Sequence, residues 1–106
     1  MAYDEKLAAR VRTLFKGKRG IVEKKMFGGV AFMVKGKMCC GVLSNDLVAR
    51  VGAEQFARVL KKPHVRPMTF TGRVSKGFVY VGPAATQNAR SLKRWVDECV
   101  AFVATL

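Results

Sequence analysis

Few titratable side chains in this 106-residue chain could carry out acid–base or nucleophilic chemistry. The one histidine, His64, lies between Pro63 and Pro67 in a basic segment. The seven carboxylates include two adjacent pairs in segments of helical pattern, where neighbouring side chains diverge and do not form a general acid/base pair. A Cys/His nucleophile would need the fold to bring His64 to Cys39 or Cys40. The sequence therefore favours a protein that is not an enzyme, with His64 in a turn or on the surface.

The cysteines do not have the spacing of a disulfide framework or a metal site. Cys39, Cys40 and Cys99 are an odd number and two are adjacent, which is typical of a reducing, cytoplasmic location. Neighbouring side chains in a strand point to opposite faces, so we expect Cys39 and Cys40 not to converge on one metal. All three are expected to be small, buried apolar side chains, and the sequence predicts no metal and no cofactor.

The motif Met26-Phe27-Gly28-Gly29 has a functional and a structural interpretation. Its glycines could suggest a phosphate-binding loop, but no dinucleotide or P-loop pattern is present. Paired glycines at the start of a strand more often serve a bulge or a close backbone crossing. We therefore predict a structural motif, in which the glycines supply backbone freedom and Phe27 or Met26 fills the core.

Positive charge is the strongest signal in the composition. Twenty basic residues against seven acidic ones give a net charge of +13, concentrated in residues 1–25 and 52–94. Such a field attracts polyanions and acidic partners, and it also keeps a small protein soluble. The candidate polyanion-binding residues are Arg66, Arg73 and Lys76, which surround aromatic side chains. No base-reading element is evident, so any binding to nucleic acid is expected to be weak and independent of sequence.

The aromatic residues near these cations could stack on bases or fill the core. In a strand over residues 77–81, Phe78 and Tyr80 share one face while Val79 and Val81 share the other, so one pair belongs to the core. We expect the aromatic pair to be the buried one.

Hydrophobic periodicity predicts a small α+β domain with an antiparallel sheet and flanking helices. Expected helices cover residues 7–16, 53–60 and 92–106, the last capped by Asn88 or Ser91. Expected strands cover residues 30–34, 38–43, 47–51, 68–71 and 77–81, with an optional short strand at 22–26. The order is α-β-β-β-α-β-β-α, and strands that are grouped without βαβ alternation favour α+β over a doubly wound sheet. Residues 1–106 are expected to form a single domain.

The surroundings of the domain can also be inferred. No stretch approaches the roughly 20 apolar residues that span a membrane, and charged residues occupy the place of a signal-peptide core. We therefore expect a soluble, cytoplasmic protein without membrane contact. The strands at 30–51 are apolar at both alternating positions, which indicates that a partner covers the second face. A homodimer through these strands is one such arrangement.

Several segments resemble the N-terminal domain of the TfoX/Sxy competence-regulator family of bacteria. The most specific are residues 26–29 (Met-Phe-Gly-Gly) and 70–73 (Phe-Thr-Gly-Arg), and similar stretches lie at 36–42, 63–68 and 76–81. The resemblance implies a stand-alone domain with a fold also compared with that of secretion chaperones, and it supplies no catalytic residues. Full-length family members carry a C-terminal domain similar to helix-hairpin-helix DNA-binding modules, and this chain contains no such segment, so we expect no specific DNA binding.

Two functions follow from these observations. The first is a non-enzymatic regulatory or protein-interaction module, with a protein partner that the sequence does not identify. The alternative is a basic accessory protein that binds nucleic acid non-specifically through its charge.

Overall fold

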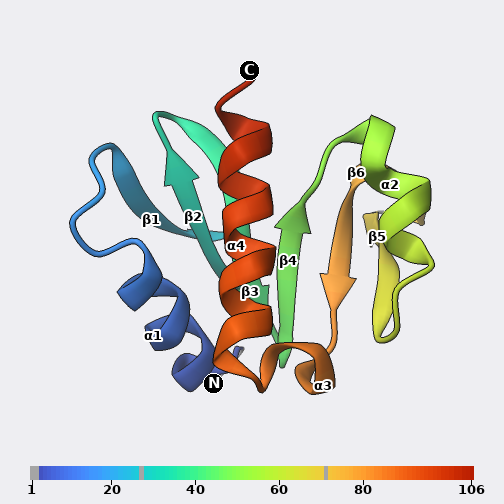
Figure 1. Cartoon of the computed structure of the whole chain (residues 1–106), viewed down its shortest axis with the longest axis horizontal. Helices are drawn as coiled ribbons and strands as arrows, with labels where there is room; N and C mark the ends of the chain where they lie inside the picture. Colours follow the sequence, from blue (N-terminus) through green and yellow to red (C-terminus); the bar gives the residue numbers. More distant parts are fainter. Residues whose placement is uncertain (1–2, 27, 71) are drawn as a thin grey trace.

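The computed structural model describes residues 3–26, 28–70 and 72–106, which form one sheet covered by helices (Figure 1). The helices are α1 (Glu5–Leu14), α2 (Ala53–Leu60), α3 (Pro83–Thr86) and α4 (Ala89–Val103). The strands are β1 (Ile21–Met26), β2 (Gly29–Val34), β3 (Lys37–Leu43), β4 (Asp46–Arg50), β5 (Val65–Phe70) and β6 (Arg73–Val81). Their order in the sheet is β1-β2-β3-β4-β6-β5, and each neighbouring pair is antiparallel. The predicted α+β class with an antiparallel sheet is confirmed.

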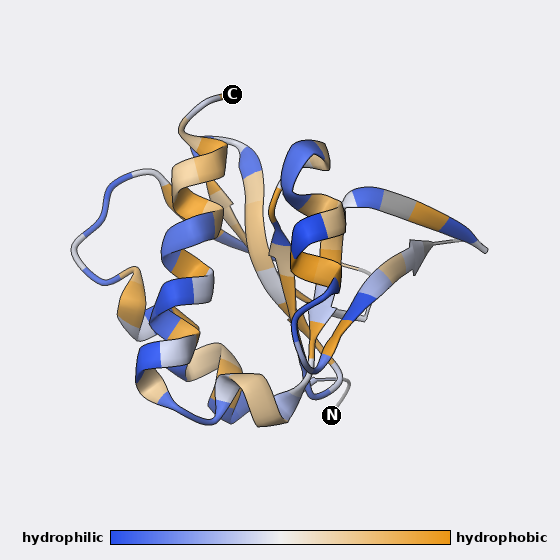
Figure 2. Ribbon diagram, turned by 45° about the vertical axis from the view of Figure 1, so that its right-hand side comes forward, coloured by the Kyte–Doolittle hydropathy of each residue, from blue (hydrophilic) through white to orange (hydrophobic). Residues whose placement is uncertain are grey.

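The helices pack on one face of the sheet, so the domain has two layers (Figures 1 and 2). α4 crosses β3 and β4, α1 packs beside it, and α2 covers β5 and β6. One apolar core fills the space between the layers. Its buried side chains include Leu7, Val11, Phe15, Phe32, Val42, Leu47, Val59, Val79, Val81, Leu92, Trp95, Val96, Cys99 and Val103. This arrangement covers only one of the two faces of the sheet.

Local sequence signals explain where the two longest helices begin. The side chain of Asp4 accepts hydrogen bonds from the backbone N–H groups of Lys6 and Leu7, at 2.9 and 3.1 Å, and so caps α1. Asn88 caps α4 in the same way, by accepting from the N–H groups of Arg90 and Ser91. Of the two predicted caps for this helix, Asn88 is the one used. None of the four described helices has the length and apolar character needed to cross a membrane.

The optional strand predicted at 22–26 is confirmed as β1, and α3 is an element that the sequence did not predict. β1 is a full strand paired with β2 over six residues, although all but Ile21 of its side chains are exposed. α3 is a single turn with Pro83 in its first turn, directly after β6. The last two strands, at 65–70 and 73–81, are also longer than the predicted 68–71 and 77–81.

A register shift in the β2–β3 pair changes the expected geometry of two cysteines. Phe32 pairs with Cys40 and Met33 pairs with Met38, so Cys39 is an extra residue in β3 and forms a β-bulge. Both thiols are fully buried in the core. The expectation that the two side chains point to opposite faces was therefore wrong, because the bulge interrupts the alternation.

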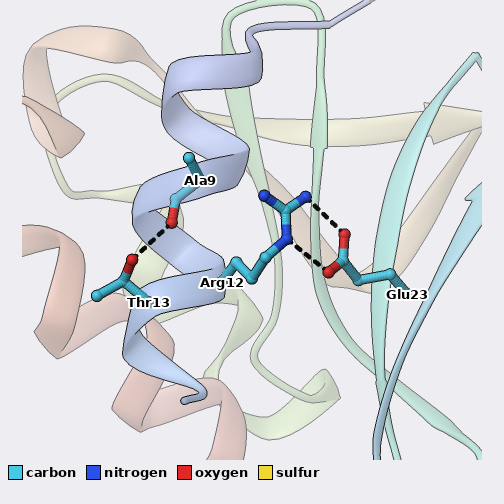
Figure 3. Close-up of polar contacts among 4 residues, drawn as sticks. All are labelled: Ala9, Arg12, Thr13 and Glu23. Atoms are coloured by element: carbon cyan, nitrogen blue, oxygen red, sulfur yellow. Dashed lines mark hydrogen bonds and ion pairs between the residues drawn. The ribbon is translucent and has the colours of Figure 1, made fainter.

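An ion pair between Arg12 and Glu23 joins α1 to β1 (Figure 3). Arg12 Nε lies 2.6 Å from Glu23 Oε2, and Arg12 Nη2 lies 2.7 Å from Oε1, so the contact is bidentate. The hydrogen bonds from Arg12 lower the pKa of Glu23. Both side chains remain partly exposed, so the pair contributes no more than about 1 kcal/mol and mainly orients α1 against the edge of the sheet.

Candidate interaction surface

In the part of the chain that the structure describes, no helix packs on the second face of the sheet, and most side chains of this face are apolar. Residues paired across neighbouring strands lie on the same face, so the register defines its members. We call this surface the open face; it comprises Val22, Lys24, Met26, Gly29, Ala31, Met33, Met38, Gly41, Leu43, Asp46, Val48, Arg50, Arg66, Phe78 and Tyr80. Nine of these fifteen residues carry an apolar or aromatic side chain.

Exposure on the open face is uneven. Val22 and Met26 on β1 are 51% and 37% exposed, whereas Ala31 and Val48 in the central strands are fully buried. The side chain of Met38 lies over Gly41, because a Cβ at Gly41 would lie 3.5 Å from Met38 Cε. Met33, Leu43 and Tyr80 are half-buried. Flexible methionine side chains therefore form much of this surface and could repack against a partner.

The cation Arg66 lies on the open face and is already paired. Its guanidinium forms a salt bridge with Asp46 of β4. It also lies over the ring of Tyr80, 5.2 Å from the ring centroid. Of the three candidate polyanion-binding residues, Arg66 is thus partly neutralised by an acidic neighbour.

Arg73 lies away from Arg66, near the far end of the β5–β6 hairpin, and Lys76 lies between them, where the register of β6 shifts. Arg66 pairs with Tyr80, and Arg73 pairs with Phe70 near the far end of the hairpin, which projects beyond the rest of the sheet (Figure 2). The register shift between Pro67 and Thr69 leaves the extra residues in β6, so the separation follows the four residues of β5 from Arg66 to Phe70, roughly 13 Å at 3.3 Å per residue. The fold therefore spreads the three predicted cations along the hairpin, with Arg66 at its inner end, Arg73 at its far end and Lys76 between them.

Comparison with protein families connects this fold to a known domain. A family model described as the TfoX N-terminal domain matches residues 13–103. The chain belongs to the TfoX N-terminal domain family. No curated protein and no solved structure gave a match. The family predicted from the glycine motifs is confirmed, and all residues of the open face lie inside the matched segment.

In this TfoX N-terminal domain, the aromatic residues of β6 lie on the face of the sheet opposite to the core face that was predicted for them. Val79 and Val81 are fully buried in the core, whereas Phe78 and Tyr80 lie outside it, and Tyr80 is half-buried. The expectation that the aromatic pair fills the core was wrong. Strand alternation defines the two sets of residues, but the packing of the helices decides which set is covered.

The two glycines of the family motif have different structural roles. Gly28 has a φ of 78° and lies in the β1–β2 turn, with open space around the position of a Cβ. Gly29 begins β2, and a Cβ there would lie 2.1 Å from the main-chain oxygen of Val42. Phe27 lies outside the described residues. Met26 is exposed on the open face, so the alternative in which it fills the core was wrong.

The groups considered for chemistry are separated or inaccessible. Among the described residues, no group of three His, Cys, Asp or Glu side chains could hold a metal ion. His64 occupies an exposed turn with a φ of 66°, and its main-chain oxygen accepts a hydrogen bond from Gly82, whereas Cys39 and Cys40 are fully buried in the core. In the part of the chain that the structure describes, the histidine and the cysteines therefore form no dyad.

The cysteines are expected to resist alkylation in the folded protein. Burial raises the pKa of Cys99, and for Cys40 the hydrogen bond to Cys39 and burial both raise the pKa. The hydrogen bond from Cys40 lowers the pKa of Cys39, but its sulfur is not accessible to a reagent. Iodoacetamide labelling followed by mass spectrometry should show no modified cysteine in the native protein and all three after denaturation. Rapid labelling of Cys39 under native conditions would contradict this.

Proposed function

We propose that this domain is a non-enzymatic regulatory module that binds an acidic protein partner through the open face. The observation that carries the proposal is the uncovered, mostly apolar sheet face. Val22 and Met26 are exposed at one edge of it, with half-buried Met33 and Leu43 next to them. Exposed apolar surface of this kind is typical of protein interaction sites.

Charge favours an acidic partner over a second copy of the chain. Each copy carries a net charge of +13, so two copies repel one another. Lys24 and Lys25 are exposed on β1, the edge strand, and lysines there oppose pairing with another basic strand. Asp46, the acidic residue of the open face, is already bound by Arg66. A partner with an apolar surface and surrounding carboxylates complements these features.

The arrangement of the titratable groups supports the non-enzymatic part of the proposal. Four of the seven carboxylates form salt bridges with basic side chains, and Asp4 caps α1. Cys40 and Cys99 are held as thiols, because their surroundings raise the pKa of each. These groups have structural roles that account for their positions without catalysis.

Non-specific binding of nucleic acid is the alternative, and the outer β5–β6 hairpin favours it. Arg73 and Lys76 lie there, and residues 61–76 contain five cations and no carboxylate. Such contacts would be made to phosphates, so binding would be weak and would fall steeply with rising salt.

A pull-down with two matched variants tests the proposal. Val22→Glu places a carboxylate on the open face, and Val74→Glu places one on the hairpin, at valines that are 51% and 52% exposed. We expect Val22→Glu to capture at least about tenfold less of a specific acidic protein than the wild type does, because the new carboxylate replaces an apolar contact and repels the acidic groups of the partner. Val74→Glu should capture as much of this protein as the wild type. The captured protein should then bind the purified domain after nuclease treatment.

Three results would contradict the proposal. Equal capture by both variants would exclude the open face as the binding surface. Capture that nuclease abolishes and that is insensitive to Val22→Glu would favour the nucleic-acid alternative. Sedimentation that shows a concentration-dependent dimer, lost in Val22→Glu, would assign the open face to a second copy of the chain.

A further inference from the structure

A second surface, on the helix side of the sheet, forms a cavity with an unusual combination of side chains. It lies between the loop that follows α1, the β2–β3 turn and the last turn of α4. Its volume is about 350 Å³, within the range of small-molecule sites. We call it the basic pocket.

The floor of the basic pocket is apolar. It is formed by Phe15, Ile21, Val34, Val100 and Val103. Phe15 stacks on Phe32 with ring centroids 5.7 Å apart, and both Phe15 and Val103 belong to the core. Rigid core side chains therefore support this floor, which makes the cavity preformed.

The rim of the basic pocket carries Lys18, Arg19, Lys35 and Lys37. Among the described residues that line the pocket, none is acidic, and none of these four cations forms a salt bridge with a carboxylate side chain. Lys37 Nζ donates to the main-chain oxygen of Leu106 at 2.9 Å.

The partial negative charge at the C-terminal end of α4 is too small to neutralise the four cations of the rim. A helix C-terminus has a partial charge of about −0.5, whereas the rim supplies four positive charges. All four cations are exposed and can turn towards a ligand. The rim therefore has an excess of positive charge that an anion would neutralise.

We propose that the basic pocket binds a small carboxylate with an aliphatic tail, of the medium-chain fatty acid class. The tail would lie on the apolar floor, and the carboxylate would accept hydrogen bonds from Lys and Arg at the rim. A neutral apolar ligand would leave four neighbouring cations uncompensated, and a highly polar anion would leave the floor of Phe15, Val34 and Val103 without contacts. An anion with an apolar body satisfies both parts of the cavity.

Calorimetric titration with octanoate tests the chemistry of the ligand. Ten non-hydrogen atoms predict a dissociation constant of about 0.01–1 mM. The affinity should rise about threefold to fourfold per added methylene from hexanoate to octanoate, because each buried methylene adds apolar contact. Acetate lacks the aliphatic tail and 1-octanol lacks the carboxylate, so each should bind at least about tenfold more weakly than octanoate. If acetate bound as tightly as octanoate, the apolar floor would contribute nothing to the affinity. If 1-octanol bound as tightly as octanoate, the rim cations would contribute nothing, and either result would contradict the proposal.

Variants locate the binding. Lys35→Asn removes one rim charge at a residue with a φ of 51°, which asparagine tolerates, and should weaken octanoate about twofold to fivefold. Ala104→Trp, at an exposed position, should fill the cavity and abolish binding. Lys61→Gln removes an exposed cation at the end of α2 and should leave the affinity unchanged. Retained binding in Ala104→Trp with native-like circular dichroism would overturn the proposal, and so would a loss in Lys61→Gln equal to that in Lys35→Asn.

Discussion

Replacing Trp95 by alanine should lower the free energy of unfolding by about 3–5 kcal/mol, which is a large part of the stability of a small domain. Trp95 is 6% exposed and lies in the apolar stripe of α4 that packs on β3 and β4. Truncation removes a large buried surface and leaves a cavity that a rigid two-layer core fills only in part. Urea unfolding followed by circular dichroism should show a lower midpoint, or no folded baseline at all.

A nearby substitution separates packing from the cation–π contact at the same residue. Lys62 Nζ lies 5.1 Å from the centroid of the Trp95 ring. Lys62→Met removes this charge and keeps most of the length of the side chain, so it should cost no more than about 1 kcal/mol. A Trp95→Ala variant that unfolds at the wild-type urea concentration would show that α4 does not stabilise the sheet through this stripe.

Much of the fold could be predicted because buried elements have a periodic apolar pattern. The stripe of α4 and the apolar strands β2, β3 and β4 are examples, and the cap at Asn88 adds a local signal. β1 has no such pattern, since all but Ile21 of its side chains are exposed. The outer hairpin carries little apolar pattern at its far end, and its strands therefore extend beyond the ranges that periodicity indicates. The bulge at Cys39 depends on the register of two strands, which hydrophobic pattern alone does not determine.

The sequence predicts that the sheet has a second apolar face, but it does not predict which residues form that face. Strands that are apolar at both alternating positions indicate a second apolar face, and the open face has that character. Which residues belong to the open face depends on the side of the sheet on which the helices pack. The helices pack on the side of Val79, which is therefore in the core, whereas Tyr80 lies outside it. Arg66, Arg73 and Lys76 are close in sequence, but the β5–β6 hairpin places Arg73 at its far end and Arg66 at its inner end. Proximity along a chain does not define a site when a long hairpin lies between its members.

Replacing Gly29 by alanine should cost about 3 kcal/mol, at the upper end of the range for overpacking. Its Cβ would lie 2.1 Å from the oxygen of Val42 and 3.2 Å from the Cα of Leu43, and these are main-chain atoms that cannot turn away. β2 and β3 would have to separate where Val30 pairs with Val42, and Val30 and Val42 belong to the core. Thermal unfolding followed by circular dichroism should show the loss as a decrease in melting temperature of about 4–8 °C per kcal/mol.

Gly28 provides the matched control for Gly29, because it is the neighbouring residue in the same motif and has a different constraint. It has a φ of 78°, and nothing lies within 4 Å of the point that a Cβ would occupy, so alanine there should cost only about 1 kcal/mol of backbone strain. Gly28→Asn should recover most of that loss, since asparagine adopts a left-handed conformation more readily. Close packing at Gly29 and backbone conformation at Gly28 thus predict different responses to the same substitution. Equal melting temperatures for Gly28→Ala and Gly29→Ala would show that β3 does not approach Gly29 as closely as its position beside Val42 requires.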